Sequence, residues 1–320
     1  MARRRQIRRL VARRLLIAIP VVVGASILIF AAGRIATPNP STSALSIFAT
    51  PETRAQFEEA RHLDEPLPVQ YGLWIGDAAR GDFGTSLVSN QPVSDAVRET
   101  LGVTLALALG AFVVSVLVGL ALGTAAGLSA GRLLDRLVTG GALLAVAVPA
   151  FWLGILLIYF LGVRWRVLPA GGYVPLSVDP VGFFKSMLLP WITLGLAPAA
   201  VLARVTRARV AEEVTKPHVR TAISLGISGR RRIQHYVLRN SLVEPTTVLG
   251  IQFGYLLGGA VLVEQVFSLP GLGRLALIAA NQGDFPIVQV TALLATMAYL
   301  LANLAVDVTH LLLESRIHRG

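Results

Sequence analysis

The sequence predicts an all-α membrane protein with six transmembrane helices and both termini in the cytoplasm. Of its 320 residues, 54% are hydrophobic and only 15% are charged, whereas a soluble domain has about a quarter charged residues. Several apolar runs reach about 18 residues, which is long enough to cross a bilayer. Backbone groups in lipid must be hydrogen-bonded internally, so each run is expected to be a helix.

The predicted spans follow one another along the chain, with polar segments between them. They cover Leu15–Gly33, Leu101–Gly131, Leu137–Val163, Met187–Ala203, Thr246–Val263 and Ile287–Val306. A basic segment, 1–14, precedes the first span, and a long extracytoplasmic segment, 34–100, follows it. The start of the chain also resembles a signal peptide. We interpret the first span as a retained helix, because its apolar run exceeds the usual signal core of about 7–15 residues.

Positive charge is concentrated on one side of the predicted membrane. The net charge is +11, and with the N-terminus inside, 20 of the 29 Lys and Arg residues lie in inside segments. Nine of them fall between Arg204 and Arg239, and seven precede Leu15. This asymmetry predicts that both termini are cytoplasmic. The basic composition therefore orients the chain and does not indicate nucleic-acid binding.

Two short motifs suggest enzyme chemistry that their surroundings disfavour. "GLSAG", Gly127–Gly131, matches the G-x-S-x-G nucleophile pattern, but a membrane helix stands where that pattern needs a strand. Because Ser129 and His310 are both expected near cytoplasmic span ends, an intramembrane serine hydrolase stays as an alternative. "GLGRLA", Gly271–Ala276, matches a dinucleotide fingerprint, but a loop containing proline replaces the required strand.

The chain is not expected to bind nucleotide or metal itself. Neither Lys185 nor Lys216 lies in a G-x-x-x-x-G-K-[ST] run, so a P-loop is missing from the sequence. The five histidines show no metal-ligand spacing, and the absence of cysteine excludes disulfides and thiolate sites. No catalytic residue and no metal site are therefore predicted.

Two predicted spans carry glycines at every fourth position, which places them on one helix face. They are Gly119, Gly123, Gly127 and Gly131 in the second span, and Gly250, Gly254 and Gly258 in the fifth. Small residues at this spacing let helices approach closely. The glycines either pack spans within this chain or form a seam to a second membrane subunit, and both uses are compatible.

The last span ends in a polar face formed by Asn303, Asp307 and His310. Ionisable groups inside a membrane are functional candidates. Asp307 lies near the predicted inner end, where capping, pairing or water would satisfy it, so we favour a structural role, with a place in the pathway as the alternative for Asn303 and Asp307. A self-sufficient secondary transporter would need coupling-ion sites near mid-membrane. Apart from Asp307 the spans lack acidic residues, which disfavours that alternative.

The basic loop between the fourth and fifth spans, about 204–245, is predicted to contain two short helices. Pro217 suits a first helical turn, Gly226 suits a left-handed helix end, and Ser228 suits the N-cap of the next helix. One face of the first helix is formed by Val219, Ala222, Ile223 and Gly226. This face either packs under the chain's own bundle, with arginines at anionic headgroups, or docks a soluble partner.

"VRTAISLGISGRRRIQHYVLRNSLVEP" resembles the cytoplasmic coupling loop of ABC importer permeases in the dipeptide/oligopeptide/nickel group. The matching residues are Val219, Arg220, Thr221, Ala222, Gly226, Ser228, Arg239, Asn240 and Pro245. "RRLLIAIPVVVGASILIF", "LDEPLPVQYGLWIGDAARGDFGTSL" and "VLVEQVFSLPGLGRL" extend the resemblance over nearly the whole chain. The long outside insert is similar to that of the first of two paralogous permeases. Pro217 and His218 replace the family's acidic-aromatic pair, and Leu225 replaces a basic residue.

The resemblance implies a type I ABC importer permease fold in a prokaryotic cytoplasmic membrane, with residues 101–320 as the permease core. It implies a second homologous permease subunit, two cytoplasmic ABC ATPases, separate or fused, and an extracytoplasmic binding protein that delivers peptides. ATP and Mg would be bound by the ATPases, and this chain would hold no cofactor. The coupling loop, including Ile223, would transmit ATP-driven closure to the spans.

Overall fold

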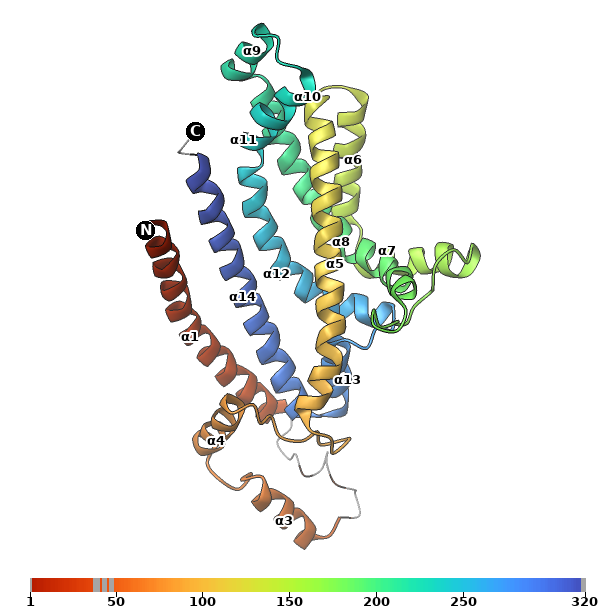
Figure 1. The fold of residues 1–320 in the computed structure, drawn as a ribbon. Helices are drawn as coiled ribbons and strands as arrows, with labels where there is room; N and C mark the ends of the chain where they lie inside the picture. Colours follow the sequence, from red (N-terminus) through yellow and green to blue (C-terminus); the bar gives the residue numbers. More distant parts are fainter. Residues whose placement is uncertain (1, 37–40, 42–44, 46–48, 318–320) are drawn as a thin grey trace. The chain divides into compact units, whose positions relative to one another are not determined.

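A computed structural model describes residues 2–36, 41, 45 and 49–317, and within these the side chains from residue 10 onward except 243, 306, 307 and 309–317 (Figure 1). Among these residues, five helices are long and apolar enough to cross a membrane, and a bent helix pair makes up to six. The predicted spans are found in the predicted order. The all-α membrane class is therefore confirmed.

The spanning helices extend beyond the apolar runs that predicted them, because their polar ends continue the same hydrogen-bonded backbone; the exception is the end of α5, at Leu128, which comes before the predicted Gly131. In chain order, the described helices are α1 (Ala2–Ala36), α3 (Pro51–Ala60), α4 (Leu67–Ala79), α5 (Val93–Leu128), α6 (Leu133–Ala147), α7 (Ala150–Leu157), the π-helix η1 (Ile158–Arg164), α8 (Pro180–Val214), α9 (Pro217–Ser224), α10 (Gly229–Arg232), the π-helix η2 (Ile233–Leu238), α11 (Arg239–Ser241), α12 (Val243–Val266), α13 (Leu272–Gln282) and α14 (Phe285–Ile317).

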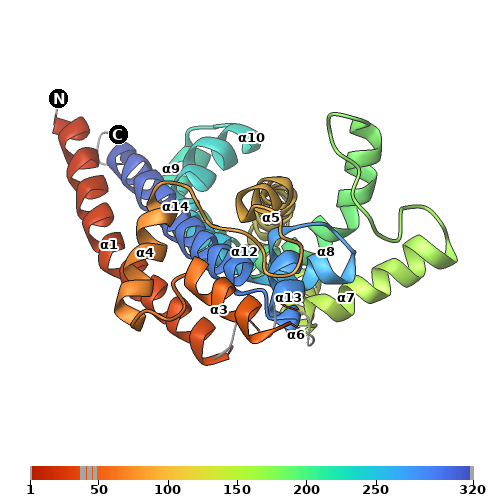
Figure 2. The ribbon, with the colours of Figure 1, turned by 90° about the horizontal axis from the view of Figure 1, so that it is seen from below.

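The third predicted span, Leu137–Val163, is not one straight helix. It is split into α6 and the run of α7 and η1, which meet at an angle of 103°. Figures 1 and 2 show α7 and η1 turning away from α6. Pro149 causes the break, because proline lacks the N–H that a helix interior needs and excludes the preceding residue from helical geometry. Val148 accordingly has extended dihedral angles, φ −80° and ψ 124°.

The chain divides into two compact units. One contains Met1–Val11, Leu105–Leu269 and Leu301–Gly320, and the other contains Ala12–Thr104 and Pro270–Leu300. We call them the loop unit, because it includes the basic loop, and the segment unit, because it includes residues 34–100.

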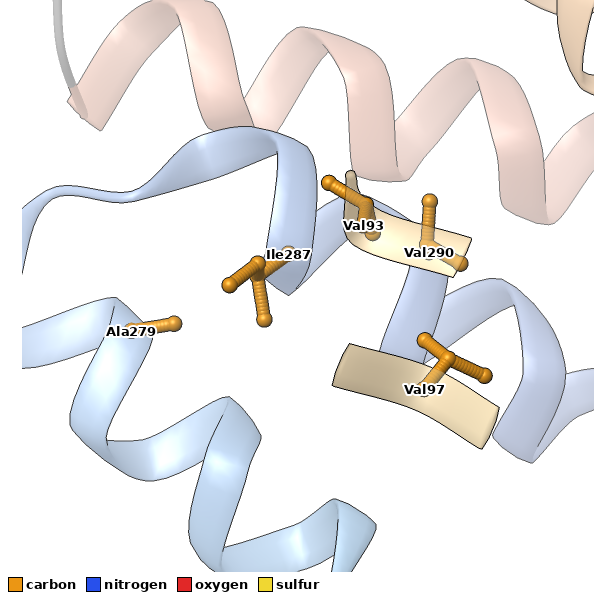
Figure 3. Packing of buried hydrophobic residues seen from close by; sticks show 5 residues of the cluster. All are labelled: Val93, Val97, Ala279, Ile287 and Val290. Atoms are coloured by element: carbon orange, nitrogen blue, oxygen red, sulfur yellow. The ribbon is translucent and has the colours of Figure 1, made fainter. Parts of the chain in front are cut away.

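The segment unit has its own apolar core. Figure 3 shows side chains of the first turns of α5 meeting those of α13 and α14; they are Val93, Val97, Ala279, Ile287 and Val290. Beside this core, the buried carboxylate of Asp284 accepts hydrogen bonds from the Ser86 hydroxyl and, at 3.1 Å, from the Leu87 amide. These contacts join the end of the predicted extracytoplasmic segment to the turn before α14.

In the loop unit, α5 packs against α8 through the glycines that the sequence singles out. An added Cβ would lie 2.9 Å from the Ala199 carbonyl oxygen at Gly119, and 2.6 Å from the Ala203 carbonyl oxygen at Gly123. At Gly127 it would lie 2.6 Å from a side-chain carbon of the opposing helix. The two backbones therefore approach too closely for any side chain at these positions.

Two of the glycines predicted to lie on a packing face do not do so. Gly131 lies after the end of α5, with φ +80°, so it forms a turn rather than a helix face. On α12, a Cβ at Gly258 would meet nothing within 4 Å, whereas one at Gly259 would lie 3.0 Å from Leu194 of α8. Gly250 is buried and Gly254 is half-buried. Their proposed role in helix packing remains a prediction.

Candidate functional site

The basic loop begins where α8 ends, and its first helix, α9, has well-defined ends. Pro217 occupies the first turn, as predicted. At the other end, Gly226 has φ +72°, also as predicted. The Gly226 amide donates to the Ile223 carbonyl at 2.9 Å, and the Ile227 amide donates to the Ala222 carbonyl at 3.1 Å. This pair of bonds is the Schellman motif, which needs a left-handed residue at its centre.

The predicted single face of α9 is divided by the structure. Val219 and Ala222 are buried, and Val219 forms a small core with Val210 of α8 and Val237 of η2. Because α9 folds back against the chain's own helices, these two side chains anchor it. For these two residues the structure therefore shows the first alternative, packing against the chain's own helices, and their place in an ATPase-coupling loop stays a prediction.

The opposite side of α9 presents apolar side chains to the surroundings. Ile223 is 53% exposed and Leu225 is 73% exposed, and Arg220 and Thr221 beside them are exposed as well. An added Cβ at Gly226 would meet nothing within 4 Å. We call Arg220, Thr221, Ile223, Leu225 and Gly226 the α9 tip. It is partly apolar and uncovered by the described part of the chain, and the Schellman motif holds its end.

A buried carboxylate at the end of α8 fixes α9 in place. Glu213 is 5% exposed. It pairs with Lys216 at 2.6 Å and His218 at 3.1 Å, and it accepts a hydrogen bond at 3.0 Å from Asn240. The bond that Lys216 donates to Glu213 raises the pKa of Lys216, which favours its charged ammonium form. Glu213 thus joins α8 to α9 and α11, a role that the sequence prediction missed.

The second half of the loop is more regular than predicted. Ser228 stands at the N-cap of α10, as predicted, but its side chain makes no capping hydrogen bond. After α10 the chain continues as η2 and α11 before α12 begins (Figure 1). Asn240 also donates to the Tyr236 carbonyl at 3.1 Å. Arg239 is exposed, and Pro245 is buried in the first turn of α12.

A second ion pair fixes the short turn between α5 and α6. The buried carboxylate of Asp135 accepts from Arg207 Nε at 2.7 Å and Nη2 at 2.6 Å, and from the Gly131 amide at 2.8 Å. A two-pronged guanidinium–carboxylate contact is strong and directional. The pair therefore links α6 to α8, close to where α8 enters the loop. The sequence prediction missed this ion pair. The feature that could have indicated it is an acidic residue, Asp135, between arginines in a predicted inside turn.

The enzyme-like motifs gain no support from the described residues. Ser129 follows a helix, and its hydroxyl donates to the Ala125 carbonyl at 2.6 Å, so it is not presented as a nucleophile. Asp307 and His310 belong to α14, but their side chains lie outside the described residues; Asn303 is half-buried. Within the described part of the chain, no group of three or more His, Asp or Glu residues is arranged to hold a metal ion.

Comparison with known proteins assigns the chain to a family. Residues 115–319 match the family described as "Binding-protein-dependent transport system inner membrane component". The chain belongs to this family. As its members do, this permease has a multi-pass helical structure in the bacterial inner membrane, and it has the type I ABC permease fold.

Several curated relatives match the permease over nearly its full length. The "Probable peptide ABC transporter permease protein y4tP" of Sinorhizobium fredii is 36% identical, covering 95% of this chain and 97% of the relative. The "Dipeptide transport system permease protein DppB" of Alkalihalophilus pseudofirmus is 34% identical, over 95% and 98%. The "Glutathione transport system permease protein GsiC" of Escherichia coli is 36% identical, over 94% and 95%.

Replacing Glu213 should release α9 from α8. Glu213→Ala leaves Lys216, His218 and Asn240 without their shared acceptor, and we expect a local loss of about 2 kcal/mol, because the partners are partly solvated. Amide hydrogen exchange over residues 217–226 should accelerate about 30-fold. Glu212→Ala is the matched control, since the neighbouring Glu212 is exposed and pairs on the surface with Arg209 and Lys216. Equal exchange rates in the two variants would contradict the anchoring role of Glu213.

Proposed function

We propose that this permease is one of two membrane subunits of an ATP-driven importer of short peptides. The α9 tip carries the proposal: it is an exposed, partly apolar surface on the loop that follows α8, in a chain of a family named for binding-protein-dependent transport. Curated relatives of near-equal length are named as peptide, dipeptide or glutathione permeases, which favours a peptide or peptide-like substrate.

The proposed orientation places the basic loop in the cytoplasm. The excess of Lys and Arg in the loop and the N-terminal segment supports this side. Residues 34–100 then lie outside, in reach of an extracytoplasmic binding protein. A second homologous permease subunit would complete the pathway, and surrounding lipid would cover the exposed apolar helix faces.

The proposed coupling is mechanical. An ATPase subunit binds the α9 tip through Ile223 and Leu225, and its movement during ATP binding shifts α9. Glu213 and the core formed by Val219 carry that shift into α8 and α11. Because α8 also packs against α5 backbone to backbone, its displacement moves a second spanning helix. The permease would conduct peptide and catalyse no covalent step.

The two rival functions have less support. A secondary transporter would need charged coupling-ion sites inside the spans, whereas the described ion pairs Asp135–Arg207 and Glu213–Lys216 hold the turn before α6 and the start of the basic loop in place. A serine hydrolase would need an accessible Ser129 hydroxyl, which is instead bonded to its own helix.

The purified permease, free of other subunits, should hydrolyse no ATP, because its sequence lacks the glycine-rich loop and lysine that hold nucleotide phosphates. Activity should be measured by phosphate release, before and after the ATPase subunits are added. We expect turnover only in the mixture, with ATP and Mg bound by the added subunits. Hydrolysis by the permease alone would contradict the proposed division of roles.

A further inference from the structure

A cavity of about 660 Å³ lies within the segment unit. The end of α1, the stretch from residue 60 to residue 92, and the start of α14 form its walls. Aromatic contacts join two of these walls, with Phe30 of α1 centred 5.6 Å from Tyr71 and 5.9 Å from Trp74 of α4. The volume falls in the range that suits small-molecule ligands, about 300–1,000 Å³.

One cationic group of the cavity is Arg34, near the end of α1. Its guanidinium donates to the side-chain oxygen of Gln70 and lies 5.6 Å from the centre of the Phe30 ring. Gln70 in turn donates to the Leu63 and Glu65 carbonyls at 3.1 Å and 2.6 Å, which fixes its position. Arg34 forms no ion pair within the described part of the chain, so several of its five N–H donors are available.

The second cationic group is Arg61. It lies 4.6 Å from the centre of the Phe57 ring and donates to the Thr85 hydroxyl at 2.9 Å. Burial lowers the pKa of Arg61, and the charge of Asp284 opposes that shift. Among the described residues Arg61 has no carboxylate within 4 Å, so it is a partly desolvated cation held by neutral contacts. An incoming carboxylate would supply the direct ion pair that Arg61 lacks.

The cavity also has acidic and apolar walls. Asp77 and Asp82 line it together with the aromatic side chains of Trp74, Phe83 and Phe285. Asp82 accepts from the Gly84 amide at 2.9 Å, and Asp77 pairs at its rim with an exposed arginine. Besides His62, the lining carries two guanidinium and two carboxylate groups, and groups of both charges suit a zwitterion better than a simple anion.

We propose that this cavity holds a short zwitterionic peptide, with the peptide carboxylate at Arg34 and Arg61, its ammonium group at Asp77 or Asp82, and a side chain against the aromatic wall. The proposal rests on peptide import as the function and adds a second place where the permease contacts its substrate, outside the membrane path. The cavity would keep a released peptide near the entrance.

The test uses the complete membrane complex in lipid nanodiscs, without binding protein, and the photoreactive dipeptide p-benzoyl-phenylalanyl-alanine. Illumination followed by peptide mapping should place the label in residues 60–92 or 285–289. The N-acetylated, C-amidated form of the same dipeptide lacks both charges, and it should label these residues at least tenfold less. Equal labelling by both forms would show apolar partitioning only and would overturn the proposal.

Variants test the assignment of the carboxylate. Arg61→Gln should weaken labelling about 10- to 100-fold, because a charge-assisted hydrogen bond is lost, and Arg61→Lys should restore part of it. Arg98→Gln is the matched control, since Arg98 is exposed at the start of α5 and lies outside the cavity lining. Unchanged labelling in Arg61→Gln would overturn the assignment.

A parallel uptake assay with binding protein distinguishes a failure of the cavity proposal from a failure of the importer function. Peptide import without charge-dependent labelling of the cavity would refute the cavity proposal and leave the importer function intact. Failure of the wild-type complex to import any peptide would refute the function itself. If the binding protein crosslinks into the cavity and excludes the dipeptide, the cavity is a docking site for that protein and the peptide proposal is wrong.

Discussion

Gly226→Val should uncouple ATP hydrolysis from peptide uptake while the transmembrane helices remain inserted. Gly226 has φ +72°, where a side chain costs about 1–2 kcal/mol of backbone strain. That cost corresponds to a 5- to 30-fold loss of the intact helix end. The side chain would meet nothing in this chain, so the damage is confined to the Schellman motif and to whatever the α9 tip contacts. Uptake and ATPase copurification should be measured at matched membrane levels.

Three further variants make this result specific. Gly226→Asn should retain most of the activity, because asparagine tolerates the left-handed region. Gly229→Ala should be nearly neutral, since Gly229 begins α10 without a positive φ and an added Cβ would make only an ordinary contact, 3.9 Å from Arg232 Nη2. Arg230→Ala should also matter little, because a single solvated charge contributes little. Normal transport by Gly226→Val would mean that the α9 tip does not couple to an ATPase.

Gly123→Leu should prevent α5 and α8 from packing and should remove most of the folded permease from the membrane. An added Cβ lies 2.6 Å from the Ala203 carbonyl oxygen and 2.7 Å from the Thr206 Cβ. These are atoms of the opposing backbone and the root of a side chain, so they cannot move aside without separating the helices. We expect a loss of about 3 kcal/mol or more, measured as thermal stability of the detergent-solubilised permease.

Gly102→Leu is the matched control for this loss. It makes the same change in α5 at an exposed position, where an added Cβ meets nothing within 4 Å. It should accumulate and melt like the wild type. If Gly123→Leu also melts like the wild type, the close approach of α5 and α8 does not contribute to stability.

The sequence predicted those structural elements that are determined by residues close together in the chain. Apolar runs located the spans, and glycine after a short helix predicted the left-handed end at Gly226. Pro149 was visible in the sequence, but the long apolar run around it favoured one span. Pro190 and Pro198 lie inside α8 without dividing it, so the presence of a proline in an apolar run does not by itself predict a break.

Contacts between distant segments could not be predicted in the same way. Ala222 and Ile223 are adjacent apolar residues, yet only Ala222 is buried, because the rotation of α9 is set by Val210 and Val237 from other elements. Gly258 and Gly259 likewise differ only in which of them faces α8. Glu213 gains its role through Asn240, which is 27 residues away. Sequence spacing alone does not bring such pairs together.

The most direct test of the central claim is uptake of a radiolabelled dipeptide by proteoliposomes that contain the permease, its partner membrane subunit and the ATPases, with binding protein added outside. We expect accumulation that requires ATP at the ATPase side and that falls at least fivefold in Gly226→Val although all subunits are present. Accumulation driven by an ion gradient without ATP would contradict it, because the permease would then be a secondary transporter.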